Sequence, residues 1–296
     1  MYDYGQVALE NTIKELKKYS VDYIGSGIDF HEAYTTKIIK QNDIKIGLLA
    51  ACENEFGCLY EEQDRGGYAW IFHPLIEDNI RKLQSEVDAI VLIAHAGVEN
   101  IDFPIKEWRD RYKRLCDVGV DVIIGHHPHV PQGYEHYNKS MIFYSLGNFY
   151  FDTASFRNKT DDSYSVILDF GIDGLMNYDL IYHKKINGQT CKVSALDVSF
   201  TVSELNSLLS TNYLRRNDEI SITLFNQYYF SYYETALGVL PKNSNTVNKI
   251  KHFIKKIIFR NINRDNRNLM LLHNLRIDTH RFVVQRALSL LSEYKQ

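Results

Sequence analysis

The middle of the chain alternates between two hydrophobic periods. Residues 74–87 begin with a proline and repeat apolar side chains at helical spacing, which predicts a helix with proline in its first turn. Residues 88–95, DAIVLIAH, are almost entirely apolar, which predicts a buried strand. A second helix over 104–119 and a second apolar strand over 120–125 follow. This order of strand, helix and strand predicts a right-handed crossover and a parallel pair.

The segments before residue 74 have a mixed pattern. The spacing predicts a helix over 6–18 and a short strand over 21–27 that ends in a glycine turn. Two β-branched runs on either side of Asn42 predict a hairpin. Residues 53–69 are polar and contain glycine, which is typical of a loop.

The chain divides into two parts by pattern and by charge. β-rich segments continue to residue 201 and helical patterns return afterwards, so we predict an α/β domain over 1–201 and a helical extension over 202–296. Residues 241–296 carry 12 Lys and Arg against 3 Asp and Glu, whereas residues 1–240 carry 22 against 34. The extension is therefore a basic segment attached to an acidic body.

Residues 246–260 form a basic amphipathic pattern within the extension. Such a helix can lie on an anionic membrane surface or bind a polyanion, and docking on the acidic body is the alternative. We expect no specific nucleic acid as a partner, because no base-reading module is recognisable.

The hydropathy of the chain and its N-terminus favour the cytoplasm, and the cysteines suggest neither a zinc knuckle nor a disulfide framework. No CxxC pair is present among Cys52, Cys58, Cys116 and Cys191. No apolar run reaches the ~20 residues that span a bilayer, and no signal peptide is recognisable. We expect a cytoplasmic protein whose route to membrane association is its basic segment.

Histidines gather at the ends of the two predicted parallel strands. The stretch GVDVIIGHHPHV, residues 119–130, contains His126, His127 and His129, and His95 ends the other strand. Neighbouring strands lie ~4.8 Å apart, so all four imidazoles are expected at one rim of the sheet. This convergence favours a metal site, and hydrogen-bonded structural histidines are the alternative.

The local chemistry around these histidines suits metal binding. Pro128 restricts the backbone between two of them, which reduces the entropy lost on binding. Gly97 and Gly125 allow close backbone approach or positive φ in the turns that aim the side chains. Imidazole suits Zn, Fe, Ni or Cu, and Mn where carboxylates share the site.

Three sequence motifs in order resemble one family. AHAGVEN, GHHPHVPQGY and YSLGNF, together with the upstream DYG and IKIGLLA, strongly resemble the bacterial capsule biosynthesis CapA family, also called the poly-gamma-glutamate synthesis family. The resemblance covers about residues 3–170. It implies the calcineurin-like metallophosphoesterase fold, a two-sheet β-sandwich flanked by helices with metals at the sheet edges.

The resemblance matches three histidines to metal ligands and makes Tyr144, Ser145 and Asn148 candidates for lining the pocket, and together with Glu99 and His126 these give eight candidate site residues. These are His95, His127 and His129 as metal ligands, Glu99 and His126 as catalytic residues, and Tyr144, Ser145 and Asn148 as substrate-binding residues. The alternative for His126 is a metal ligand or an orienting donor. Glu99 is otherwise the acceptor that orients a metal-bound histidine, or a solvated carboxylate. The alternative for the last three is a role in turns and the core. The implied cofactor is one or two divalent ions of Mn, Fe or Zn.

The family pattern begins before this sequence does. In the family, a Gly-Asp block and an Asn-His pair precede the Asp-Tyr-Gly triplet, whereas here the chain opens Met1-Tyr2-Asp3-Tyr4-Gly5. We therefore expect an N-terminally truncated domain or a misassigned start. Strands supplied by a separate chain and a non-catalytic remnant of the fold are the alternatives.

Two functions follow from the resemblance. The first is a metal-dependent phosphoesterase-type hydrolase in the biosynthesis of a capsule, polyglutamate or cell-surface polysaccharide, acting on an anionic polymer or a phosphorylated substrate. The second is a non-catalytic assembly factor of the same pathway that binds a polyanion or membrane surface through its basic segment.

Overall fold

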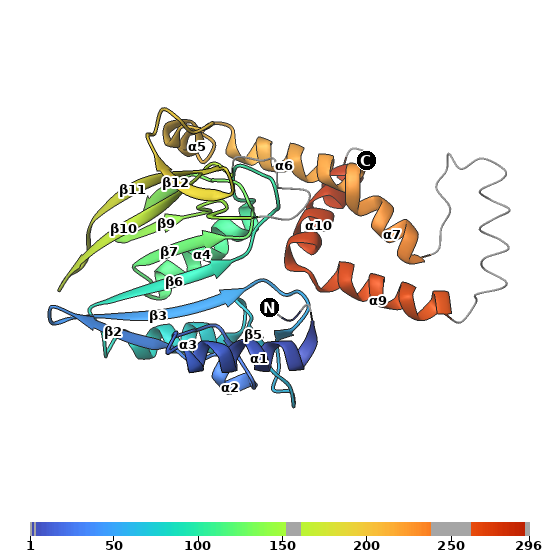
Figure 1. The fold of residues 1–296 in the computed structure, drawn as a ribbon. Coiled ribbons are helices and arrows are strands. Elements are labelled where there is room, and N and C mark those ends of the chain that lie inside the picture. The colour runs from blue at the N-terminus through green and yellow to red at the C-terminus, as the bar shows by residue number, and fades with distance from the viewer. Residues whose placement is uncertain (1, 3, 152–160, 238–261, 294–296) are drawn as a thin grey trace, which may run out of the picture. The chain divides into compact units, whose positions relative to one another are not determined.

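The computed structural model describes residues 2, 4–151, 161–237 and 262–293 (Figure 1). They fall into two compact units, Met1–Tyr213 and Leu214–Gln296. The domain division expected from the sequence, 1–201 and 202–296, stays a prediction.

A six-stranded sheet forms the centre of the first unit, in the order β2-β3-β6-β7-β9-β8 (Figure 1). Its four inner strands are parallel, and each edge strand is joined by a hairpin to its neighbour. The predicted parallel pair of neighbouring strands is confirmed as β6 and β7. The strands are β2 (Lys37–Gln41), β3 (Ile44–Cys52), β6 (Ala89–His95), β7 (Val122–His126), β8 (Tyr134–Tyr137) and β9 (Ser140–Phe143).

The hairpin predicted around Asn42 is also confirmed. Gln41 pairs with Ile44, so the turn has two residues, Asn42 and Asp43. Both have positive φ, 50° and 65°. Asn and Asp tolerate this left-handed conformation, and a turn of this kind matches the twist of the strands it joins.

A second, antiparallel sheet packs on the first. It contains β10 (Ser163–Gly171), β11 (Gly174–Ile186) and β12 (Gln189–Val193). Val91, Val122 and Phe143 of the first sheet are buried in one cluster with Tyr164 of the second. Burial of this apolar surface between the sheets stabilises the fold by ~25 cal/mol per Å². The expected two-sheet sandwich is therefore confirmed.

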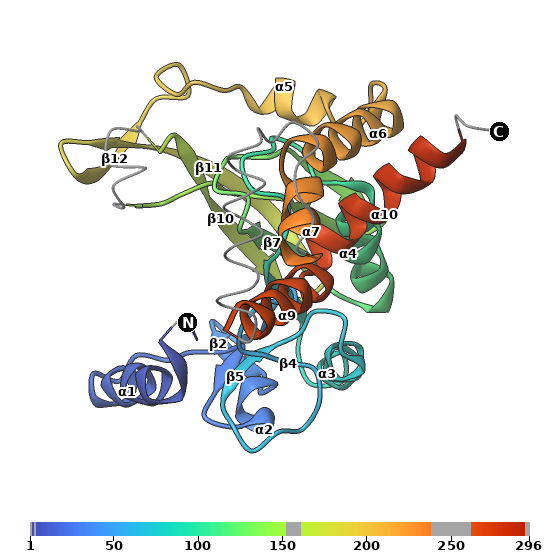
Figure 2. The same cartoon turned by 90° about the vertical axis from the view of Figure 1, so that its right-hand side faces the viewer.

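Helices α3 (Pro74–Leu83) and α4 (Lys106–Val118) cover the other face of the six-stranded sheet (Figures 1 and 2). On β3, Ile46 and Leu48 pack in the sandwich core, whereas a side chain at Gly47 between them would meet Leu83 of α3. The opposite directions of successive side chains explain this division. The other helices of this unit are α1 (Gly5–Lys18), α2 (Phe30–Ala33) and α5 (Val202–Ser207).

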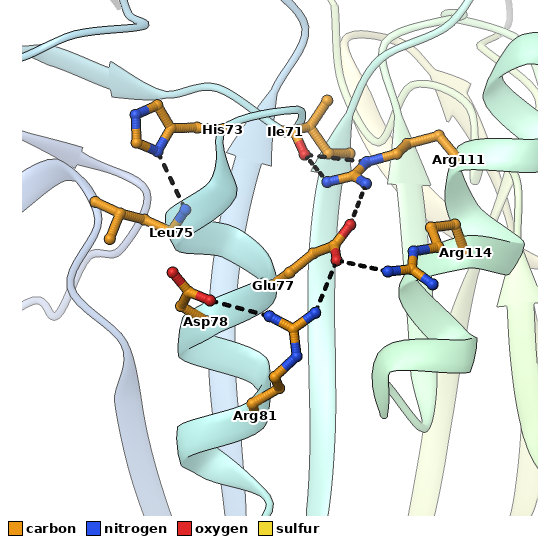
Figure 3. A network of polar contacts seen from close by, with 8 residues as sticks. All are labelled: Ile71, His73, Leu75, Glu77, Asp78, Arg81, Arg111 and Arg114. Atoms are coloured by element: carbon orange, nitrogen blue, oxygen red, sulfur yellow. Dashed lines mark hydrogen bonds and ion pairs between the residues drawn. The ribbon is translucent and has the colours of Figure 1, made fainter.

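A carboxylate joins α3 to α4 (Figure 3). Glu77 accepts hydrogen bonds from Arg111 at 2.7 Å, Arg114 at 3.0 Å and Arg81 at 3.1 Å. Partial burial by itself would raise the pKa of Glu77, but the hydrogen bonds from Arg111 and Arg114 outweigh it and hold that pKa below its usual value. Arg111 also donates to the carbonyl of Ile71, so the network fixes the segment before α3.

A small third sheet corrects two expectations. The strand expected over 21–27 is wrong except for β1 (Ser26–Gly27), and the expected loop over 53–69 contains β4 (Cys58–Leu59) and β5 (Gly67–Ala69). These strands have two or three residues each. Runs this short carry no readable alternation, so tertiary contacts decide their pairing.

The second unit is helical, which confirms the expected helical C-terminal extension. It contains most of α6 (Tyr213–Leu224), the π-helix η1 (Phe225–Tyr229), α7 (Phe230–Leu237), α9 (Ile262–Arg276) and α10 (Asp278–Glu293). No helix in the described part of the chain is long and apolar enough to cross a membrane. The amphipathic pattern at 246–260 lies outside the described residues.

Candidate functional site

Three parallel strands end together at one edge of the central sheet. Cys52 of β3 pairs with His95 of β6, and His95 pairs with His126 of β7. The residue after β3, Glu53, donates its backbone N–H to the carbonyl of His95 at 3.1 Å. The register therefore brings a carboxylate and two of the predicted histidines to the same rim.

His95 and His127 contact each other directly. Nδ1 of His127 lies 3.2 Å from Nε2 of His95, and the two ring planes meet at 76°. His127 has φ 94°, an uncommon backbone conformation for a residue other than glycine. The structure thus brings His95 and His127 into direct contact, and the ring of the third predicted ligand, His129, lies 5.9 Å from the His127 ring.

Gly97 is required for this arrangement. Its φ is +140°, and a Cβ at this position would lie 2.8 Å from Cγ of Pro128. Asn100 also donates its backbone N–H to the Pro128 carbonyl at 2.7 Å. The turn after β6 therefore packs directly on the His-Pro-His segment. This agrees with the close backbone approach that was expected at Gly97.

Glu53 is a site residue that the sequence reasoning missed. Its side chain is 1% exposed, and Oε1 accepts the Gly97 N–H at 3.1 Å. The same oxygen lies 3.6 Å from Nε2 of His127, on the opposite side of that ring from His95. The sequence did contain a signal for Glu53, because it directly follows a strand that ends at this edge. The same rule, that ligands gather at the carboxyl ends of parallel strands, identified His95.

His129 has a different partner. Its φ is 61°, and its Nδ1 lies 2.9 Å from Oδ1 of Asn148. The Phe151 ring packs 5.1 Å from the His129 ring. Asn148, predicted to bind substrate, is 9% exposed and contacts the predicted metal ligand.

Desolvation lowers the pKa of two histidines at the rim, His95 and His126. His95 is exposed at the rim, yet protein surrounds most of it, and this desolvation, together with His126 and His129, lowers the pKa of His95 to about 4. Desolvation also lowers the pKa of His126. Neutral imidazoles keep a ring nitrogen lone pair for a ligand at physiological pH.

Tyr144 and Ser145 lie in the core. Tyr144 is 1% exposed, donates its hydroxyl to Glu135 at 2.5 Å and stacks on Tyr112. Burial and then Glu135 raise the pKa of Tyr144 well above its usual value. Ser145 is fully buried and donates to the carbonyl of Val130 at 2.8 Å. Their substrate-binding role stays a prediction.

Glu99 occupies an exposed position in the turn between Val98 and Asn100. The backbone of this turn contacts Pro128, so Glu99 is near the histidine segment in the fold. Its catalytic role stays a prediction.

The donor atoms fit a divalent ion as a pair. Nitrogen atoms 3.2 Å apart on two imidazole rings match the separation of two ligands on one ion with bonds of ~2.1 Å. Among the described residues, however, no group of three or more His, Cys, Asp or Glu is arranged to hold a metal. The carboxylate behind His127 and the amide behind His129 are the kind of acceptor that orients a metal-binding imidazole.

Comparisons with known proteins identify related sequences. The family model of the bacterial capsule synthesis protein PGA_cap matches residues 1–153. The chain is 29% identical over 231 residues to the capsule biosynthesis protein CapA of Bacillus anthracis, covering 76% of this chain and 56% of that protein. It is 33% identical over 169 residues to the PGA biosynthesis protein CapA of Bacillus subtilis (strain 168), covering 53% of this chain and 42% of that protein. The chain therefore spans about half the length of these curated relatives.

Similar solved structures are more distant. The sulfate thiohydrolase SoxB of Thermus thermophilus, in complex with glycerol, is 14% identical with a TM-score of 0.39, covering 71% of this chain and 35% of that chain. The NAD nucleotidase NadN of Haemophilus influenzae is 14% identical with a TM-score of 0.33, covering 72% and 44%.

Proposed function

Because the chain belongs to the bacterial capsule synthesis protein family PGA_cap, we propose that its first compact unit is a metal-dependent phosphoesterase-type hydrolase acting in capsule or cell-surface polymer synthesis. The observation that carries the proposal is the facing pair of nitrogens on His95 and His127, with the buried Glu53 behind His127.

The protein's own residues divide into two roles. His95 and His127 would hold a divalent ion of Mn, Fe or Zn, joined by His129, while Glu53 and Asn148 orient the rings of His127 and His129. When bound, such an ion supplies Lewis-acid polarisation of a phosphoryl oxygen. A second ion and a direct role for His126 or Glu99 are part of the same proposal.

The substrate class follows from this chemistry. Divalent ions at a sheet edge would bind phosphorylated groups and anionic polymers, because the phosphate and carboxylate oxygens of such substrates are hard ligands. Contact of residues 246–260 with an anionic membrane surface remains a separate prediction, since these residues lie outside the described ones.

Metal content and turnover test the proposal together. The measurements are Mn, Fe and Zn per chain by mass spectrometry, and hydrolysis of p-nitrophenyl phosphate and bis-p-nitrophenyl phosphate. We expect the His127→Ala/His129→Ala double variant to lose both bound metal and hydrolysis. His136→Ala is the matched control, because His136 is an exposed histidine on β8 of the same unit.

Equal metal content in the wild type and the double variant would overturn the metal site. Metal binding without hydrolysis of either ester, combined with normal capsule formation by a His95→Asn/His127→Ala strain, would instead support the non-catalytic assembly factor.

A further inference from the structure

We infer that Lys185 and Asp161 are positioning residues for His129, acting through Asn148 to hold the imidazole with its proton on Nδ1 and its lone pair on Nε2. The inference rests on the proposed function only for the identity of the ligand at Nε2. The tautomer of the ring follows from the contacts alone.

A row of polar contacts connects four side chains in the order Lys185, Asp161, Asn148 and His129. Nζ of Lys185 on β11 lies 2.7 Å from Oδ2 of Asp161, and Oδ1 of Asp161 accepts from Nδ2 of Asn148 at 3.4 Å. Oδ1 of Asn148 lies 2.9 Å from Nδ1 of His129. This row of contacts thus reaches from the second sheet to the histidine rim of the first.

The hydrogen-bonding capacity of each group allows only one orientation of the Asn148 amide between Asp161 and His129. A carboxylate only accepts hydrogen bonds, so Asp161, which forms an ion pair with Lys185, must face the amide nitrogen of Asn148 rather than its oxygen. The carbonyl oxygen of Asn148 is then the atom that faces His129. Because that oxygen only accepts, Nδ1 of His129 must carry the proton, which leaves Nε2 as the acceptor.

Burial of Lys185 and Asp161 strengthens this orientation of the Asn148 amide. The side chains of Lys185 and Asp161 are 5% and 2% exposed, so water cannot replace either partner easily. Removing one member of a buried ion pair leaves the other charge uncompensated. The pair therefore fixes the Asn148 amide more strongly than an exposed pair would.

Lys185 also fixes a second neighbour of His129. Its Nζ donates to the carbonyl of Phe151 at 2.7 Å, and the ring of Phe151 packs on His129. One lysine thus holds both the hydrogen-bond acceptor and the aromatic ring that contact this histidine.

The test reads the tautomer directly. Long-range 1H–15N spectra of metal-free, histidine-labelled protein at about pH 8 distinguish a proton on Nδ1 from one on Nε2, because an unperturbed histidine is neutral there. A His129→Gln spectrum assigns the signal. We expect the Nδ1–H form in the wild type, a shift toward the Nε2–H form in Lys185→Met, and recovery in Lys185→Arg.

Lys192→Met is the matched control, because Lys192 is an exposed lysine on β12 of the same sheet. We expect its His129 signal to match that of the wild type. Zinc titration adds a second readout, with affinity about 10–100-fold weaker in Lys185→Met and unchanged in Lys192→Met.

An unchanged Nδ1–H signal in Lys185→Met overturns the inference. If that variant does not fold, Lys185→Met/Asp161→Asn removes both charges of the pair, and an unchanged signal there has the same meaning. Absence of zinc binding by the wild type would reject the proposed function while the tautomer result still decides this inference.

Discussion

Nε2 of His127 lies 3.6 Å from Oε1 of Glu53, a buried carboxylate that also accepts the backbone N–H of Gly97. Glu53 follows β3 and His127 follows β7, so the contact links the ends of two strands that are not neighbours. It leaves Nδ1 of His127 facing His95. The geometry is that of an imidazole oriented from behind by a carboxylate.

Replacing Glu53 with Gln is expected to weaken zinc binding by about 10–100-fold, because the orienting negative charge behind His127 is lost. Isothermal titration with zinc measures the effect. Glu62→Gln serves as control, since Glu62 is exposed and pairs with His31. Equal affinity in both variants would show that Glu53 does not orient the ring.

Gly97→Ala is expected to destabilise the fold through a specific clash with Pro128. Gly188→Ala is the matched control, because Gly188 also has positive φ but its Cβ would meet open space. Gly188→Ala carries the backbone cost of the left-handed helical conformation, roughly 1–2 kcal/mol. The φ of +140° at Gly97 lies outside that conformation, and Gly97→Ala also adds about 1–3 kcal/mol of overpacking. Urea denaturation measures the difference, and equal losses would contradict the role of the contact.

Tyr144→Phe distinguishes a core role from a substrate-binding role. The change removes the hydrogen bond to Glu135, which retains its two hydrogen bonds from Arg109. We expect the free energy of unfolding to fall by about 1.5 kcal/mol while KM for p-nitrophenyl phosphate stays unchanged. A several-fold rise in KM at unchanged stability would support substrate binding instead.

Acid is expected to destabilise the protein through His95. The pKa of His95 is about 4 in the folded chain, whereas an unfolded histidine titrates at ~6.5, so the unfolded state binds more protons between these values. The free energy of unfolding should therefore fall as the pH decreases from about 6.5 toward 4.

His95→Asn isolates this contribution. Desolvation lowers the pKa of His280 to about 4 as well, so the wild type loses stability from more than one histidine. The informative quantity is the difference between the wild type and His95→Asn in urea denaturation at the two pH values. Identical pH slopes would show that His95 titrates normally in the folded state.

The sequence predicted the part of the site that depends on strand ends. Two apolar runs identified β6 and β7, and the histidines after them were expected at one rim, as the pairing of His95 with His126 shows. Motif resemblance singled out Asn148, and the structure places it against His129. The physical basis is that hydrophobic periodicity encodes buried strands, and parallel strands end on the same side.

The tertiary structure alone decided which side chains support these histidines. Glu53 lies in a segment that reads as a polar loop, and only the order β3-β6-β7 places it behind His127. Lys185 belongs to a strand of the second sheet, and its pairing with Asp161 depends on how the two sheets pack. Local patterns carry no information about contacts between distant segments. The sequence therefore determined the strands and the histidines at their ends, whereas sheet order and packing determined which atom of each ring faces the site.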